Sequence, residues 1–222
     1  VCVNGESHGE QCAPNSYVLG PMADSAKSLR LYFGALVSFR FPDFKNVATR
    51  PRPRQTNLPE YFLIYTARNC VGFREAAFDA MKSLGTVFAG GSCYGTSKVK
   101  QYPALPREKG WETIIEAYKS FRFALVMENV LKDGYITEKI ITAFLGNTIP
   151  IYYGTTDVFK LFNKDAFIYY DIHNPQPALD RIRYLETNLT AYAEVITQPI
   201  LANGEQTLEE YFSLSDDVGG GK

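Results

Sequence analysis

Short apolar runs alternate with stretches of helical periodicity from Tyr61 onward, and this alternation restricts the fold more than any other feature of the sequence. The apolar runs are rich in β-branched and aromatic residues, which predicts buried strands. Strands joined by helices pair in parallel, so we expect an α/β fold, a doubly wound parallel sheet covered by helices. The expected strands are 61–66, 86–89, 121–127, 149–153 and 166–170, and the expected helices are 73–84, 111–118, 135–145, 156–162, 178–185 and 191–197.

The beginning of the chain follows a different pattern. It holds short strand candidates at 2–3 and 17–19 and one apolar stretch at 29–39 that is compatible with strand or helix. A proline-spaced basic segment, 49–54, then predicts a linker between domains. Because the chain opens as a strand already in progress, without initiator Met, signal peptide or anchor, we expect a piece of a longer protein. The expected parts are a partial N-terminal domain at 1–58, a C-terminal domain at 59–200, and an extension with a disordered polar tail at 201–222.

Charge and hydrophobicity argue against a nucleic-acid partner and against a membrane-spanning segment. The formal net charge is -1, with 23 Lys and Arg interleaved among 24 Asp and Glu, so no basic field exists to hold a nucleic acid. The longest apolar runs, such as 61–65 and 123–127, fall far short of the roughly 20 residues that a membrane helix needs. We therefore expect no transmembrane segment in this chain, whereas a full-length form can carry a membrane anchor.

The four cysteines, Cys2, Cys12, Cys70 and Cys93, lack the paired spacing of a zinc site, and the two histidines do not complete one, so we expect no structural metal. An even number of cysteines is compatible with two disulfides in a secretory compartment and equally with four free thiols in the cytosol. A glycosylation sequon at Asn188 matters only if the chain enters a secretory lumen. The compartment therefore stays open.

A candidate ligand site follows the expected strand 121–127. The strand ends in polar residues, an Asp-Gly loop follows, and a helix opens beyond it. Ligands of open α/β sheets bind beyond the carboxyl ends of the strands, near helix N-termini. Here Lys139 can neutralise a phosphate, Glu138 can accept hydrogen bonds from ribose hydroxyls, and Asn129 and Tyr135 can donate from the rim. The same residues also fit a purely structural interpretation, in which Glu138 stabilises the helix dipole and Lys139 is a solvated charge.

Arg74, at the start of the expected helix 73–84, is open to the same two interpretations, a ligand-binding role or a purely structural one. A cation at a helix N-terminus opposes the helix dipole, so its position is unfavourable without a partner. An anion bound at that turn would remove the conflict. Arg74 is therefore a candidate phosphate ligand.

Three segments with fixed spacing resemble one protein family. They are FALVMEN at 123–129, GYITEKI at 134–140 and GNTIPIYYG at 146–154. Together they resemble the signature of the α-1,3/α-1,4-fucosyltransferases. Upstream, RNC at 68–70 with Arg74 resembles the family's Ser-Asn-Cys segment and its following arginine, and GGSC at 90–93 resembles its glycine-containing turn.

The resemblance implies the GT-B arrangement, two Rossmann-like domains that face a cleft. The C-terminal domain would bind GDP-fucose and the N-terminal domain would supply the acceptor site and the catalytic base. By resemblance, Arg74 and Lys139 hold the diphosphate, Glu138 holds the ribose, and Asn129 and Tyr135 make the donor's other polar contacts. Arginine and lysine would also stabilise charge on the departing GDP, so the resemblance implies no metal or other cofactor.

Inverting transfer also needs a carboxylate that takes the proton of the acceptor hydroxyl. In bacterial relatives a Gly-Glu pair holds it, followed by two further short segments of the N-terminal domain. The segments 1–7, 17–20 and 29–33 run in the same order here, so Glu6 is the expected base and Glu10 the reserve.

The chain departs from the family pattern at several positions. Met127 stands where Phe is usual, Arg68 replaces the serine before Asn69, and no proline follows Arg30; we expect these to be tolerable packing or loop changes. Cys70 and Cys93 fit a lumenal disulfide beside the donor-domain helix. Eukaryotic relatives work in the Golgi and bacterial ones in the cytoplasm, so location stays open.

The expected function is transfer of L-fucose from GDP-fucose to a hydroxyl of N-acetylglucosamine or glucose in an oligosaccharide acceptor, with inversion. One alternative is a GT-B transferase that uses another nucleotide sugar. The other is an inactive, truncated remnant that binds a nucleotide or a glycan.

Overall fold

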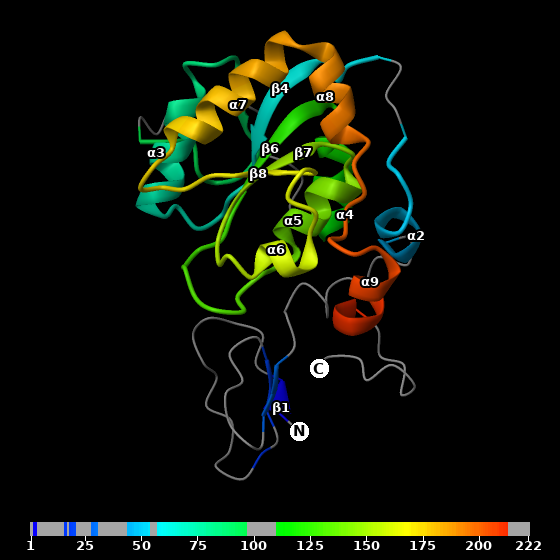
Figure 1. Cartoon of the computed structure of the whole chain (residues 1–222). Helices are drawn as coiled ribbons and strands as arrows, with labels where there is room; N and C mark the ends of the chain where they lie inside the picture. The colour runs from blue at the N-terminus through cyan, green and yellow to red at the C-terminus, as the bar shows by residue number, and fades with distance from the viewer. Residues whose placement is uncertain are drawn as a thin grey trace.

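A five-stranded parallel sheet forms the centre of the computed structural model, which describes residues 2–3, 16, 18–20, 28–30, 44–53, 57–96 and 110–212 (Figure 1). Every neighbouring pair in this sheet is parallel. Its strands, in sheet order, are β5 (Val87–Ala89), β4 (Tyr61–Tyr65), β6 (Phe121–Met127), β7 (Ile149–Tyr153) and β8 (Ile168–Tyr169). The central strand β6 is buried along most of its length, as its apolar composition predicts.

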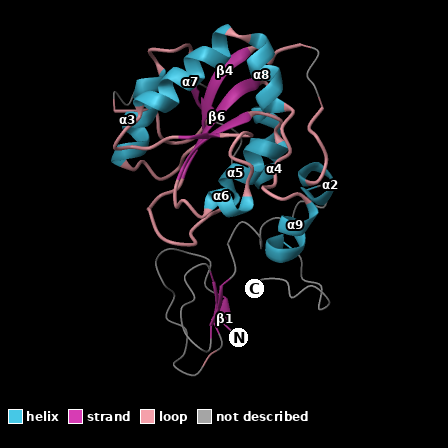
Figure 2. Cartoon of the chain, viewed as in Figure 1, coloured by secondary structure: helices cyan, strands magenta, loops and turns pink. Residues whose placement is uncertain are grey.

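Helices cover both faces of this sheet (Figure 2). Successive side chains of a strand point to opposite faces. Ile64 and Ala124 therefore pack with α4, α5, α6 and α9, whereas Leu63 and Phe123 pack with α3, α7 and α8. The doubly wound α/β fold is thus confirmed. The helices are α3 (Gly72–Met81), α4 (Gly110–Tyr118), α5 (Glu138–Leu145), α6 (Val158–Leu161), α7 (Gln176–Thr187), α8 (Leu189–Ile196) and α9 (Glu205–Phe212).

The expected elements of this part all exist, and the start of α5 differs from its expected position by three residues. We expected that helix to begin at Tyr135, but it begins at Glu138. Thr137 is the N-cap residue and has extended backbone angles, φ −105 and ψ −174. Its N–H donates to the buried carboxylate of Glu128 at 2.7 Å, which keeps the preceding residues out of the helix. The expected helix 156–162 and strand 166–170 are likewise shorter, at Val158–Leu161 and Ile168–Tyr169.

A second, three-stranded parallel sheet lies near the N-terminus. Its strands β1 (Cys2–Val3), β2 (Val18–Gly20) and β3 (Ser28–Arg30) pair in that order. The stretch 29–39, which we left open between strand and helix, begins as a strand, and its part beyond Arg30 lies outside the described residues. None of the described helices combines the length and the apolar character needed to cross a bilayer.

The segment predicted as a basic linker is attached to the larger sheet. Arg52 is only 3% exposed, and its guanidinium donates to the carbonyls of Thr148 at 3.2 Å, Ala166 at 3.3 Å and Val195 at 3.1 Å. Burial lowers the pKa of Arg52 to about 10, which leaves the side chain charged at neutral pH. Arg52 is therefore a buried anchor rather than a solvated linker charge.

The helix that precedes the Arg52 segment packs against α9, the last described helix. Helix α2 (Phe44–Ala48) places Phe44 against Phe212 of α9, with ring centroids 5.3 Å apart. Phe212 also contacts Phe162 at 6.1 Å. Part of the expected extension at 201–222 is therefore a packed helix, and the tail after Phe212 lies outside the described residues. The domain limits 1–58, 59–200 and 201–222 stay predictions.

Candidate functional site

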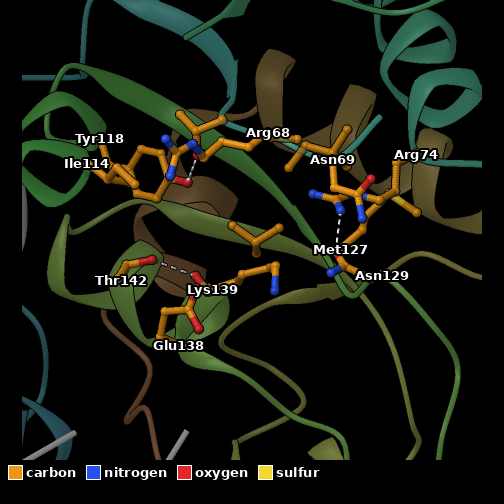
Figure 3. Close-up of a pocket in the computed structure, with 14 residues that line it drawn as sticks. Arg68, Asn69, Arg74, Ile114, Tyr118, Met127, Asn129, Glu138, Lys139 and Thr142 are labelled. Atoms are coloured by element: carbon orange, nitrogen blue, oxygen red, sulfur yellow. Dashed lines mark hydrogen bonds between the residues drawn. The ribbon is translucent and has the colours of Figure 1, made fainter. Parts of the chain in front are cut away.

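A pocket of about 230 Å³, lined by both charged and apolar side chains, opens at the carboxyl ends of β4 and β6, between α3, α4 and α5 (Figure 3). Parallel sheets place their ligand sites at this edge, where loops and helix N-termini converge. The pocket is lined by Thr66, Ala67, Arg68, Asn69, Arg74, Ile114, Tyr118, Leu125, Val126, Met127, Asn129, Glu138, Lys139 and Thr142.

Arg74 is the most deeply buried cation of this pocket, at 3% exposed. It lies in the first turn of α3, and its Nη1 donates to Oδ1 of Asn129 at 2.5 Å. The guanidinium carbon lies 5.9 Å from the ring centre of Tyr65, while Nε has no hydrogen-bond partner among the described residues. No carboxylate in the described part of the chain forms an ion pair with it. A buried cation at a helix N-terminus without an anion is unfavourable unless a ligand supplies the anion.

Lys139 lies at the N-terminus of α5 and is held in position by two oxygens. Its Nζ donates to Oε2 of Glu128 at 2.9 Å and to Oγ1 of Thr137 at 2.7 Å. Burial alone lowers the pKa of Lys139, but the carboxylates of Glu128 and Glu138 outweigh burial and raise it above its usual value. The amino group is therefore positively charged at physiological pH and available to an anionic ligand on its partly exposed side.

Glu128 is a residue of the site that sequence reasoning missed. Its side chain has no exposed surface, and it accepts hydrogen bonds from both the N–H and the Oγ1 of Thr137 in addition to the bond from Lys139. A buried carboxylate is stable only when paired and hydrogen-bonded in this way. An acidic residue directly after an apolar strand was the sequence signal that could have identified Glu128 as part of the site. Glu128 fixes the start of α5 and the position of Lys139.

The structure brings together most of the predicted donor residues. Arg74, Asn129, Glu138 and Lys139 all line the pocket. Tyr135 does not, because it is 2% exposed and precedes the helix. Its predicted donor contact stays a prediction, as do the roles of the other four residues.

The predicted catalytic base cannot be placed beside this group, since Glu6 and the reserve Glu10 lie outside the described residues.

The two changes from the family pattern that do fall in this region both line the pocket. Met127 is completely buried at the end of β6, and Arg68 is an exposed residue of the loop after β4.

A disulfide supports one wall of the pocket. Cys70 and Cys93 are bonded, with their Cα atoms 5.3 Å apart, and they join the loop after β4 to the loop after β5. This settles the alternative left open by the sequence for that pair, while Cys12 lies outside the described residues. The two sulfurs and Glu75 form a group with metal-ligand spacing among the described residues. Because the sulfurs are bonded to each other, they offer no thiolates to a metal.

A family model matches this part of the chain. Residues 63–197 match the C-terminal domain of glycosyltransferase family 10, the fucosyltransferases. An α-(1,3)-fucosyltransferase of Helicobacter pylori is 37% identical over 124 residues, which are 55% of this chain and 24% of the relative. A fucosyltransferase homologue of Acanthamoeba polyphaga mimivirus is 37% identical over 107 residues, 47% of this chain and 18% of the relative. The matched segments thus span less than a quarter of these relatives' length.

Solved structures agree with this assignment. The structure of an α1,3-fucosyltransferase with GDP has a TM-score of 0.65 and 25% identity, covering 89% of this chain and 65% of the other. A second α1,3-fucosyltransferase structure has a TM-score of 0.61 and 27% identity, covering 83% of this chain and 59% of the other. The predicted family and its α/β fold are therefore both confirmed: the chain belongs to glycosyltransferase family 10, the fucosyltransferases.

Proposed function

We propose that this chain provides the donor-binding part of an inverting glycosyltransferase, which transfers L-fucose from GDP-fucose to a hydroxyl of N-acetylglucosamine or glucose in an oligosaccharide. The observation that carries the proposal is the buried guanidinium of Arg74, which lacks an anionic partner among the described residues and lines the same pocket as Lys139. A diphosphate is the kind of ligand that two such cations accept. Solved relatives contain GDP and GDP-fucose, which supports this choice of ligand.

In this proposal each pocket residue has one task. Arg74 and Lys139 bind the diphosphate, and Asn129 keeps the Arg74 guanidinium in place through the bond to its Oδ1. Glu138 accepts hydrogen bonds from the ribose hydroxyls. Glu128 takes no part in the chemistry and holds Lys139.

The transfer step needs one bond to form and one to break. The acceptor oxygen attacks the anomeric carbon of fucose from the face opposite GDP, while the predicted base Glu6 takes the hydroxyl proton. The bond between the anomeric carbon and the β-phosphate oxygen breaks, and its electrons leave with GDP. Arg74 and Lys139 stabilise the negative charge that develops there, so no metal ion takes part in the proposed step.

A transfer assay tests the proposal. The chain is incubated with GDP-fucose labelled in the sugar and an N-acetyllactosamine acceptor, in the presence of EDTA. We expect label in the oligosaccharide, no label after Lys139→Met, and normal transfer by the control Lys164→Met, whose exposed lysine is outside the pocket. Transfer only from another nucleotide sugar would contradict the proposal, whereas GDP binding without any transfer would limit this chain to its donor-binding part. Loss of transfer in Glu6→Gln with GDP affinity intact would assign the base, and full transfer by that variant would exclude Glu6.

A further inference from the structure

The pocket contains a cation that the proposed donor contacts do not use. Arg68 lies in the loop after β4, is exposed, and lines the pocket together with Arg74 and Lys139. Its guanidinium has no hydrogen-bond or ion-pair partner within the described part of the chain. A serine is usual at this position in the family that the sequence resembles, so Arg68 is a feature of this chain.

The pocket residues follow one another in a definite order (Figure 3). Arg74 and Asn129 lie at one end, Lys139 lies near the middle, and Glu138 lies beyond Lys139 on the side away from Arg74. Ile114 and Tyr118 of α4 lie at the other end, and the Arg68 side chain extends toward them. The list of lining residues places all of these around the same cavity.

A nucleoside diphosphate has a matching order of phosphates, ribose and base. If Arg74 and Lys139 bind the phosphates and Glu138 binds the ribose, the base reaches the end formed by α4. There Ile114 offers apolar surface to a planar base, and the buried ring of Tyr118 lines the pocket beside it. A 2.6 Å hydrogen bond between the Tyr118 hydroxyl and Thr66 Oγ1 holds that ring in place.

An arginine at this end suits guanine in particular. Guanine presents two neighbouring acceptors, O6 and N7, and the planar fork of arginine donates two parallel hydrogen bonds to them. Adenine has an amino group in place of O6, so one of these bonds is replaced by a contact between two donors. Arg68 can therefore discriminate between the two purines.

We propose that Arg68 is a specificity-determining residue, which selects a guanine nucleotide by donating to O6 and N7 of the base at the α4 end of the pocket. This inference rests on the proposed function, because it requires a nucleoside diphosphate in the pocket. A different role for the same cation, binding of a phosphate, would not distinguish one base from another.

Calorimetry with three nucleotides separates these roles. GDP, 7-deaza-GDP, which lacks the N7 acceptor, and ADP are titrated into the wild-type chain and into Arg68→Met. The matched control is Arg50→Met, because Arg50 is an exposed arginine that does not line the pocket. We expect Arg68→Met to raise the Kd of GDP about five- to tenfold, since one bidentate contact at an exposed position is lost. The Kd of 7-deaza-GDP should rise less, and that of ADP by less than about twofold.

Two results would overturn the inference while leaving the proposed function intact. Wild-type binding of GDP with an unchanged Kd in Arg68→Met would show that Arg68 makes no useful contact. An equal rise in the Kd of all three nucleotides in Arg68→Met would show that Arg68 binds a phosphate and not the base. If the wild-type chain fails to bind GDP at all, the proposed function fails and this inference fails with it.

Discussion

The amino group of Lys139 lies 2.9 Å from a carboxylate oxygen of Glu128, a side chain with no exposed surface. The pair joins the end of β6 to the start of α5, at the edge of the sheet where parallel α/β proteins bind ligands. The carboxylate also accepts hydrogen bonds from the N–H and the hydroxyl of Thr137. One buried acid therefore fixes both the beginning of the helix and the position of the cation that faces the pocket.

The variant Glu128→Gln tests this arrangement. It keeps the shape of the side chain but removes the negative charge opposite Lys139. We expect the free energy of unfolding to fall by about 1–3 kcal/mol, below the usual cost of breaking a buried pair because Lys139 retains access to water. Urea unfolding of wild type and variant measures the change. The exposed acid Glu209 provides the control Glu209→Gln, and equal stability of all three proteins would show that the Glu128 charge is not needed.

Replacement of Arg74 should affect binding far more than stability. Arg74→Met removes a charge-assisted contact to a phosphate, so we expect the Kd of GDP to rise by at least about tenfold. The lost bond to Asn129 is offset by relief of the unfavourable helix dipole, so stability without ligand should change by less than about 1 kcal/mol. Calorimetry and urea unfolding measure the two quantities.

Arg183→Met on α7 is the control for Arg74→Met, because Arg183 is a well-exposed arginine away from the pocket. Unchanged GDP affinity in Arg74→Met would contradict the assignment. A large loss of stability would instead indicate that Arg74 supports the fold.

The disulfide between Cys70 and Cys93 should contribute to both stability and binding. It closes a loop with a sequence separation of 23 residues, and loops of this size correspond to about 3 kcal/mol. We expect the double variant Cys70→Ala/Cys93→Ala to lose about that amount and to bind GDP more weakly, because the loop that carries Arg68 and Asn69 is released. Urea unfolding and calorimetry of the variant check both effects. Stability equal to wild type would show that the bond does not constrain this loop.

Stability should decline at high pH, in part because of Tyr118. Burial raises the pKa of Tyr118 to about 12, although its hydrogen bond with Thr66 opposes the shift. In the unfolded chain a tyrosine loses its proton near pH 10, so between about pH 10 and 12 the unfolded state binds fewer protons and the free energy of unfolding falls. The raised pKa of Lys139 acts in the same direction, since its stabilisation is present below the unfolded pKa and is lost as pH rises through the folded one.

Tyr118→Phe removes the tyrosine part of this pH dependence. We expect its stability to decline less steeply than that of wild type between pH 10 and 12, by up to about 1.4 kcal/mol per pH unit. Urea unfolding at a series of pH values measures the slope. Tyr184 is 49% exposed, so Tyr184→Phe is the control. If the free energy of unfolding falls equally steeply with pH in wild type and Tyr118→Phe, burial does not raise the pKa of Tyr118.

The sheet and its helices could be predicted from the sequence, because strand and helix periodicity are local properties. Strand 121–127 was predicted to the residue, as its apolar run ends sharply at both sides. The start of α5 was not, since Thr137 has extended backbone angles and donates its N–H to Glu128, nine residues earlier. Local periodicity does not contain that contact.

Arg52 shows a second limit of prediction from sequence. In a proline-spaced basic segment it has the pattern of a solvated linker, and its burial depends on carbonyls 96 to 143 residues away. The candidate site was more accessible to prediction. Arg74, Asn129, Glu138 and Lys139 were candidates from their positions after strands and at helix starts, and the family resemblance assigned them to one donor site. Tyr135 was placed wrongly within the helix, and it does not line the pocket.

Calorimetric titration with GDP, UDP and ADP in the presence of EDTA tests the central claim most directly, because it asks only whether this pocket binds the donor's nucleotide. The account predicts that GDP binds with the lowest Kd and that Lys139→Met weakens this binding, whereas Lys164→Met does not. A chain that fails to bind GDP, or that binds UDP or ADP more tightly, would contradict the account.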